Sequence, residues 1–333
     1  MKILILLEST QNNDNFLYMK ALADALSADG YEPKIVFTTA GCPADHTYQL
    51  VKDYVVHHLT KLCFTSGDAG YAERLANHIA KYEYDFLVVL KNDYGFLVSD
   101  VYDKIEGSKP RLVFFGSECC RGVTRAAEEL AACDPVWVAN SEMVAKYSLA
   151  KYDVQIINGP AVQPEDTGAD IRAEFGIPKH IKVLGYWGNV DIVKWDEVLE
   201  AARRMKCLVL VAGTGDRIET LVQTKFVKVV PAIPHCRGDW YRAVDCFIYP
   251  VGMSGFPMLV LEAALCNCPV AMTPVSDMYK MCRNEFGFFD YKPEKIVEAV
   301  AAACCLDRAA VRESISAKFS VLKFLSDWQI LLS

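Results

Sequence analysis

The chain has 333 residues, a length that favours two domains over a single core. Apolar residues make up 52% of it and charged residues 23%, the proportions of an ordinary soluble globular protein. A net charge of −7 argues against a general coat for nucleic acid or an anionic membrane, so either partner would need a local basic patch.

The N-terminal residues 1–8 contain one lysine and a short apolar run that stops at Glu8. The run is too short for a signal-peptide core, and no small-residue cleavage site follows it. We therefore predict a first buried strand here. No apolar stretch approaches the ~20 residues that cross a bilayer, so we expect no transmembrane segment and a cytoplasmic location.

The first half alternates apolar runs with segments of helical period, which is typical of parallel sheets covered on both faces. Ser141 is the expected N-cap of the last helix. The predicted strands are residues 3–7, 34–37, 86–90, 111–115, 136–139 and 154–157, and the predicted helices are residues 16–27, 71–82, 124–132 and 141–151.

Residues 158–179 break this periodicity with several Pro and Gly residues, and a domain boundary is predicted there. We therefore expect one domain over residues 1–160, a second over 180–310, and a helical segment over 311–333 that packs back on the first. In the second half, the predicted strands are residues 182–185, 208–212, 227–230, 246–249 and 269–272, and the predicted helices are residues 195–205, 217–223, 258–265 and 293–305.

The thirteen cysteines include two adjacent pairs, Cys119–Cys120 and Cys304–Cys305, and no Cys-x-x-Cys spacing. This spacing fits neither a zinc ribbon nor a disulfide framework. We expect reduced and mostly buried thiols that pack as small hydrophobes.

The most informative stretch is residues 249–270, which reads as a strand, a loop with glycines, a helix and a second strand. The unpaired N–H groups and the dipole of a helix start favour a phosphate, and glycine allows the backbone to approach it. Glu262 lies about two turns into this helix, where its carboxylate can accept hydrogen bonds from sugar hydroxyls.

This stretch resembles the donor-binding domain of retaining GT-B glycosyltransferases of the family-four kind (glycosyl transferases group 1). The matching residues are Gly255-Phe256, residues 261–264 and residues 268–270. The resemblance implies an α/β fold of two doubly wound, Rossmann-like domains that face each other across a cleft, with the acceptor bound by residues 1–160 and the nucleotide-sugar donor by residues 180–310. It assigns the ribose to Glu262, whereas Ser254 stands where the family has a catalytic-site Glu.

Other pieces of the second half resemble the family's donor loops in the expected order. Residues 185–189 resemble the first of these loops, with Tyr186 near the position of the usual Arg, so Lys194 is the local cation for the donor diphosphate. The surface alternative for a lone lysine at a helix start stays open. Donor contacts are predicted at Gly188, Lys194, Gly213, Gly215, Gly255, Phe256, Pro257 and Glu262.

The first half offers candidates for the acceptor and the reaction centre. Asn13 and Asp14 lie in a polar loop after the first strand and can bind an acceptor or cap a helix. Glu118, where relatives often carry a His, and Asp93 follow two other strands. Together with Ser254 they are the catalytic candidates, although acids at such positions also serve as caps or surface residues.

We expect a hexosyl- or pentosyltransferase that uses a nucleotide-diphosphate sugar with retention. No two aspartates stand two apart, so neither a metal nor another cofactor is expected. A glycan or other soluble acceptor is favoured, and a modified DNA base stays open. The rivals are a nucleotide-sugar epimerase or phosphorylase of the same fold, and a nucleotide-sugar-binding protein that has lost turnover.

Overall fold

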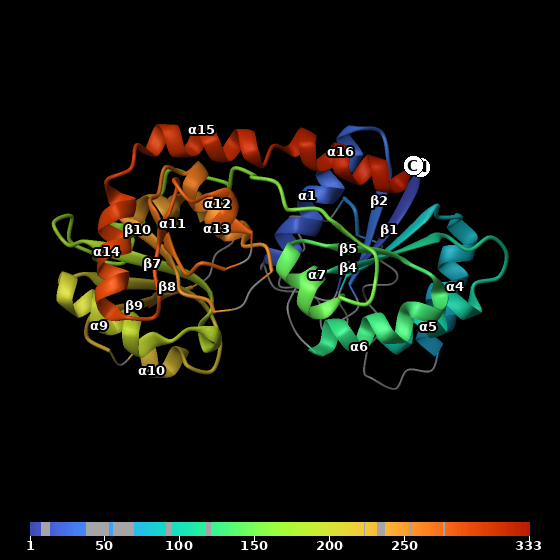
Figure 1. The fold of residues 1–333 in the computed structure, drawn as a ribbon, viewed down its shortest axis with the longest axis horizontal. Coiled ribbons are helices and arrows are strands. Elements are labelled where there is room, and N and C mark those ends of the chain that lie inside the picture. The colour runs from blue at the N-terminus through green and yellow to red at the C-terminus, as the bar shows by residue number, and fades with distance from the viewer. Residues whose placement is uncertain are drawn as a thin grey trace. The chain divides into compact units, whose positions relative to one another are not determined.

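The computed structural model describes residues 1–7, 14–37, 53–55, 70–90, 95–117, 121–222, 224–231, 237–252, 255–275 and 277–333. The chain forms two units, of which the first comprises residues 1–160 and 321–333 and the second residues 161–320. Each unit is built on one six-stranded sheet with helices on both faces (Figure 1).

The sheet of the first unit is parallel throughout, in the order β2-β1-β3-β4-β5-β6. Its strands are β1 (Lys2–Leu7), β2 (Glu32–Phe37), β3 (Phe86–Leu90), β4 (Arg111–Gly116), β5 (Val136–Ala139) and β6 (Val154–Ile156). Its helices are α1 (Asp14–Ala28), α4 (Gly70–Tyr82), α5 (Gly95–Lys104), α6 (Arg121–Leu130), α7 (Glu142–Ser148) and α16 (Val321–Leu332), with a 3₁₀ turn at Ala131–Cys133.

The sheet of the second unit is also parallel, in the order β12-β11-β10-β7-β8-β9. Its strands are β7 (Val183–Asn189), β8 (Leu208–Thr214), β9 (Val227–Val230), β10 (Cys246–Tyr249), β11 (Val270–Met272) and β12 (Gly287–Phe288). Its helices are α8 (Ile171–Glu174), α9 (Trp195–Met205), α10 (Ile218–Val222), α11 (Arg237–Ala243), α12 (Met258–Leu265), α13 (Met278–Met281), α14 (Pro293–Cys304) and α15 (Arg308–Lys318), with a 3₁₀ turn at Val190–Ile192.

The strands are apolar on both faces because helices cover both faces of each parallel sheet. Every residue of β3 is buried, as are Ile3–Leu7 of β1. Ser141 caps α7 as expected, with its hydroxyl accepting from the N–H of Val144 at 3.3 Å. The predicted α/β fold of two doubly wound units is confirmed, while α5, α8, α13 and β12 were not among the predicted elements.

Each sheet has a point where the strand order reverses, between β1 and β3 in the first unit and between β7 and β10 in the second. In open parallel sheets, ligands bind beyond the carboxyl ends of the strands at such a point. The loops after β7 and β10 are therefore the place to look for a ligand site in the second unit.

The helical segment expected over residues 311–333 is not one continuous helix, because α15 ends at Lys318 and α16 begins at Val321, with Phe319 between them. The Phe319 side chain is buried, and the centre of its ring lies 5.4 Å from the centre of the Phe256 ring. The backbone carbonyl of Phe319 accepts from the N–H of Ala161 at 2.7 Å. α15 belongs to the second unit, whereas α16 packs on α1 in the first (Figure 1). There the indole N–H of Trp328 donates to the hydroxyl of Tyr18 at 3.2 Å.

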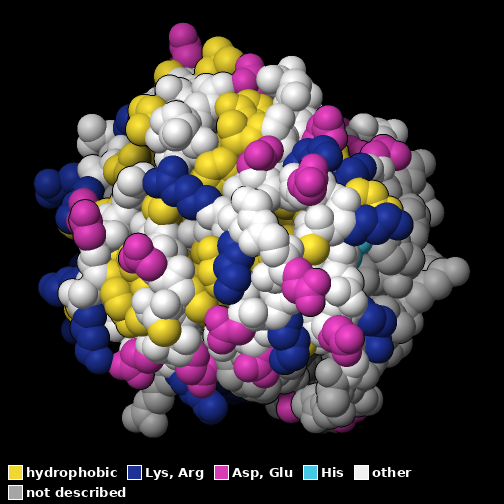
Figure 2. All heavy atoms as spheres, turned by 90° about the vertical axis from the view of Figure 1, so that its right-hand side faces the viewer, with side chains coloured by type: hydrophobic (Ala, Val, Ile, Leu, Met, Phe, Trp, Pro, Cys, Tyr) yellow, Lys and Arg dark blue, Asp and Glu magenta, His cyan; other side chains and the backbone are white. Residues whose placement is uncertain are grey.

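The surface drawn in Figure 2, on the side of α4 and α5, mixes Lys and Arg with Asp and Glu and has no broad basic area among its coloured side chains. Of the helices in the described ranges, none has both the length and the apolar character needed to cross a bilayer.

Candidate functional site

The loops that follow β7 and β10 meet at the carboxyl edge of the second sheet. Val193, beyond β7, forms an antiparallel bridge with Val251, beyond β10. The next residues along each loop are Lys194 and Gly252, so the bridge brings both to the switch point.

Tyr291 links these two loops. Its hydroxyl donates to the carbonyl of Pro250 at 2.9 Å, and the Lys194 ammonium lies 4.6 Å from the centre of its ring, an arrangement that favours a cation. Burial and the negative charge of Glu197 raise the pKa of Tyr291 to about 12, so the hydroxyl remains a donor at neutral pH. Lys194 itself is exposed and can meet an anion. Sequence analysis missed Tyr291, which lies far along the chain from either loop.

Arg217 brings a second cation to the same edge. Its side chain is exposed, and its Nη1 donates at 3.1 Å to the carbonyl of Val193, which is the residue before Lys194. Tyr186, which the resemblance puts near the usual Arg, is buried and donates to the carbonyl of Asn189 at 2.7 Å. The charge that the motif lacks at Tyr186 is therefore present nearby, supplied by the loop after β8.

Three of the predicted donor glycines lie together at the ends of β7 and β8. Gly188 pairs with Gly213 across the strands, and a Cβ on Gly213 would collide with the carbonyl oxygen of Gly188. Gly215 has a φ of +132°, and a Cβ there would stand 2.7 Å from the carboxylate of Asp191. Close packing of the strand ends is sufficient reason for these glycines.

The Asp191 carboxylate occupies the turn after Gly215. It accepts hydrogen bonds from the backbone N–H groups of Asp216 and Arg217, both at 3.0 Å. Backbone N–H groups in such a turn are natural anion ligands, and here an anion of the chain itself already takes these two.

The segment that enters α12 is buried. Phe256 packs against Phe319, Pro257 is the N-cap residue, and α12 is buried along its whole length. Phe256 and Pro257 therefore shape the loop through packing and backbone rather than by exposing a side chain. Gly255 lies in the same loop entering α12.

Glu262 forms a buried ion pair that sequence analysis missed. Its two carboxylate oxygens accept from Nε and Nη2 of Arg237 at 2.8 and 2.9 Å, and Tyr241 donates to it at 3.4 Å. The two side chains are 6% and 5% exposed. Burial raises the pKa of Glu262, while the Arg237 charge opposes the rise. Arg237 lies 25 residues earlier, at the start of α11, and no local pattern announces the pairing.

The first turn of α11 is held by hydrogen bonds to Thr167, which lies before α8. Asp239 is buried, and its carboxylate accepts from the N–H and hydroxyl of Thr167 at 3.0 and 2.7 Å and from Arg242. Burial tends to raise the pKa of Asp239, but these hydrogen bonds bring it well below its usual range. The helix that carries Arg237 is thereby fixed.

The other predicted site residues are not placed. Asp93, Glu118, Ser254 and Asn13 lie outside the described residues, and Asp14 is described only as the backbone start of α1. Their catalytic and acceptor-binding roles stay predictions. Within the described ranges, no three or more His, Cys, Asp and Glu side chains are arranged to hold a metal ion.

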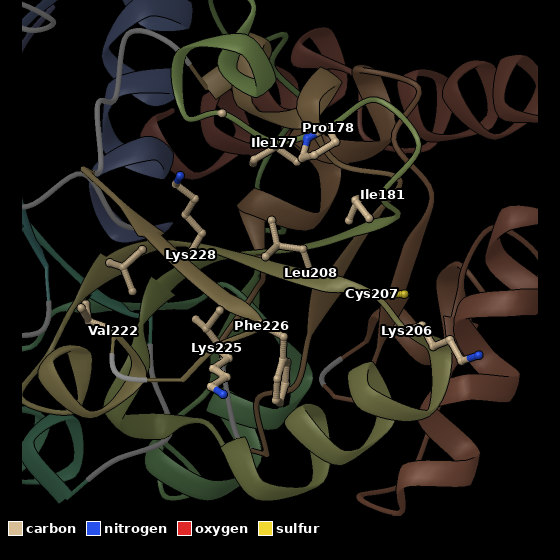
Figure 3. Close-up of a pocket in the computed structure, with 13 residues that line it drawn as sticks. Ile177, Pro178, Ile181, Lys206, Cys207, Leu208, Val222, Lys225, Phe226 and Lys228 are labelled. Carbon is tan, nitrogen blue, oxygen red and sulfur yellow. The ribbon is translucent and has the colours of Figure 1, made fainter.

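A separate pocket of about 630 Å³ lies at the opposite, amino end of β8, beside β9 (Figure 3). Ile177, Pro178 and Phe226 contribute apolar walls. Figure 3 shows that the Lys206, Lys225 and Lys228 side chains point in different directions, and Lys228 donates to the carbonyl of Phe175. The polar groups of this pocket do not converge on one point, and the pocket lies away from the loops after β7 and β10.

Comparison with known proteins agrees with the motif resemblance. Residues 181–305 match the family described as glycosyl transferases group 1. A D-inositol 3-phosphate glycosyltransferase from Streptosporangium roseum is 30% identical over 184 residues, which are 47% of this chain and 41% of that relative. The match thus spans less than half the length of the curated relative.

The solved structures that resemble the whole chain include the following two. Anabaena HepE, in complex with UDP and glucose, has a TM-score of 0.76 at 14% identity and covers 100% of this chain and 99% of its own. Sucrose-phosphate synthase from Thermosynechococcus elongatus has a TM-score of 0.73 at 17% identity, covering 99% and 98%. At these identities the likeness establishes the fold, which is the predicted GT-B fold.

Proposed function

Because residues 181–305 match the glycosyl transferases group 1 family and the chain has the GT-B fold, we propose that this protein transfers a sugar from a nucleotide-diphosphate donor to an acceptor hydroxyl. The observation that carries the proposal is the meeting of Lys194, Arg217 and Tyr291 at the switch point of the second sheet.

The two cations neutralise the donor diphosphate. Lys194 and Arg217 approach the same loop from different elements, so a diphosphate between them gains charge-assisted hydrogen bonds from both. The start of α12 adds a dipole of the same sense. Fixed positive groups of this kind also stabilise the charge that develops on the leaving diphosphate, which is how they promote transfer.

The nucleoside lies toward α11 and α12. Glu262 is the ribose contact that the motif implies, and in this chain it acts together with Arg237. A ribose hydroxyl that donates to this carboxylate shares it with the guanidinium, so binding weakens if either member is removed. We propose retention of anomeric configuration on the basis of the resemblance, with attack on the face that the diphosphate leaves.

The acceptor is proposed to be a glycan or another soluble hydroxyl compound. A nucleic-acid acceptor would need a broad basic surface, and the face in Figure 2 carries mixed charges. Ser254 in place of the family's Glu favours one second candidate, a protein that binds nucleotide sugars without turning them over.

Donor binding and turnover are tested in sequence. In a thermal-shift screen of UDP, GDP, ADP and their sugars, we expect the ligands of one base to raise the Tm of the protein. Lys194→Ala should weaken the binding of that ligand about tenfold. Lys225 is an exposed lysine of the remote pocket, and Lys225→Ala should leave the binding unchanged. Released nucleotide diphosphate then measures turnover. Tight donor binding without release from any donor would establish the second candidate, and no binding at all would refute both.

A further inference from the structure

The exposed carboxylate of Asp191 joins the loop after β7 to the turn after β8. One of its oxygens accepts from the backbone N–H of Asp216 and the other from that of Arg217, both at 3.0 Å. The N–H of Asp191 itself donates to the side-chain oxygen of Asn189 at 2.9 Å, in a 3₁₀ turn that Asn189 caps. The backbone that carries the carboxylate is therefore fixed, and both carboxylate oxygens hold the neighbouring turn.

The turn after β8 has a shape that admits this carboxylate. Asn189 and Thr214 pair at the ends of β7 and β8, so the two loops leave the sheet side by side. Gly215 then turns with a φ of +132°, and a Cβ on it would lie 2.7 Å from Oδ2 of Asp191. A side chain at residue 215 would push the carboxylate away from the two N–H groups. The contact thus depends on a glycine in one loop and an aspartate in the other.

Arg217 is held at both ends. Asp191 binds its backbone N–H, and its Nη1 donates at 3.1 Å to the carbonyl of Val193, two residues beyond Asp191. Val193 in turn bridges Val251 in the loop after β10. A guanidinium has five N–H donors, so the bond to Val193 leaves others for an anion. The position of the Arg217 charge relative to Lys194 follows from these contacts.

We propose that Asp191 is a positioning residue of the donor site, which holds the turn at Asp216 and Arg217 and so sets the Arg217 guanidinium next to Lys194 for the donor diphosphate. This role rests on the proposed function and adds a residue that the motif does not include. Asp191 does not bind the diphosphate itself, because a carboxylate repels phosphate charge. Its two hydrogen bonds to the turn offset that repulsion by ordering a cation before the donor arrives.

The sign of one change separates positioning from charge alone. If Asp191 acted only through its negative charge, its removal would tighten diphosphate binding. If it positions Arg217, Asp191→Ala should weaken that binding. Asp216→Ala is the matched control, because it removes an exposed charge from the same turn and keeps both hydrogen bonds, whose donors are backbone N–H groups.

Isothermal titration calorimetry with UDP, GDP and ADP measures the effect on whichever of the three the wild type binds. We expect Asp191→Ala to weaken diphosphate binding about fivefold. Asp191→Asn, which keeps one acceptor oxygen, should weaken it about twofold. Asp216→Ala should bind the diphosphate at least as tightly as the wild type.

A double variant tests whether Asp191 acts through Arg217. Arg217→Ala alone should weaken diphosphate binding about tenfold. Asp191→Ala/Arg217→Ala should weaken it no further, because no guanidinium is left to position. Independent effects of the two residues would instead multiply to about fiftyfold.

Hydrogen exchange without ligand tests the contact itself. In Asp191→Ala the amides of Asp216 and Arg217 should exchange about three- to tenfold faster than in the wild type, read by mass spectrometry of a peptide over residues 214–218. Unchanged exchange, tighter diphosphate binding in Asp191→Ala, or losses that multiply in the double variant would overturn the role of Asp191 and leave the donor site intact. A wild type that binds none of the three diphosphates refutes the donor site, and the role of Asp191 with it.

Discussion

Removing the Arg237 guanidinium should destabilise the second unit far more than removing an arginine from its surface. Both members of the Arg237–Glu262 pair are almost fully buried, and two short hydrogen bonds hold them. Arg237→Leu leaves Glu262 in a site without a countercharge, and breaking one partner of a buried pair costs about 3–5 kcal/mol. Arg204→Leu, which breaks a half-exposed pair with Glu200 on α9, should cost about 0.5 kcal/mol.

The loss should depend on pH in a defined sense. Without Arg237, nothing comparable opposes the burial that raises the pKa of Glu262 above its ordinary 4.5. A carboxyl whose pKa is raised in the folded state does no harm while it is protonated in both states, at low pH. As pH rises above 4.5, the unfolded state ionises first and stability falls. The deficit of Arg237→Leu should therefore be larger at about pH 8 than at about pH 5.

Urea unfolding followed by tryptophan fluorescence measures both effects. Trp240 reports on the site, because its ring packs edge-to-face on Tyr241 at 5.6 Å between centroids. The double variant Arg237→Leu/Glu262→Leu should recover most of the lost stability, since no buried charge is left. A single variant within about 1 kcal/mol of the wild type, or a deficit independent of pH, would show that the pair is not the buried ionic contact described above.

Three further changes test the framework of the two units. Gly213→Ala should lower the free energy of unfolding by about 1–3 kcal/mol or more, because its Cβ would meet the Gly188 carbonyl. Gly252→Ala should lower it less, since the Cβ there stands 3.3 Å from the Tyr291 hydroxyl. Equal urea midpoints for the two variants would contradict this reasoning. Asp239→Asn should lower stability at neutral pH and flatten its decline below about pH 4, because the depressed pKa makes the Asp239 contribution present above its ordinary value and lost as pH falls; an unchanged acid limb in the pH titration would count against it. Trp328→Ala should cost the first unit about 3–5 kcal/mol by removing a fully buried ring on α16, measured as a shift in Tm, and an unshifted Tm would mean that α16 does not stabilise it.

Sequence pattern predicted what depends on neighbours along the chain. Runs such as Ile3–Leu7 must be strands because a covered parallel sheet buries both faces, and Ser141 caps its helix through a contact three residues away. The break at Phe319 escaped because it depends on the distant ring of Phe256.

The residues of the candidate site also fall into two groups, those that the sequence order predicts and those that only the fold brings in. Lys194 and the glycines follow from the order of the loops, but Arg217, Tyr291 and Arg237 reach the site through contacts that no spacing encodes. The donor contacts predicted at Gly188, Gly213 and Gly215 stay predictions, because the structure gives these glycines a packing reason of their own. Packing of strand ends, not the approach of a ligand, already forbids a side chain at Gly213.

The assignment of α16 to the first unit bears on the order in which the protein folds during synthesis. The hydroxyl of Tyr18 receives its bond from Trp328, 310 residues later. A ribosome therefore releases the whole of residues 161–320 before it supplies the helix that covers α1. The second unit can complete its core while the first, although made earlier, still waits with apolar surface uncovered. A chaperone that binds nascent chains should accordingly stay on the N-terminal half longest.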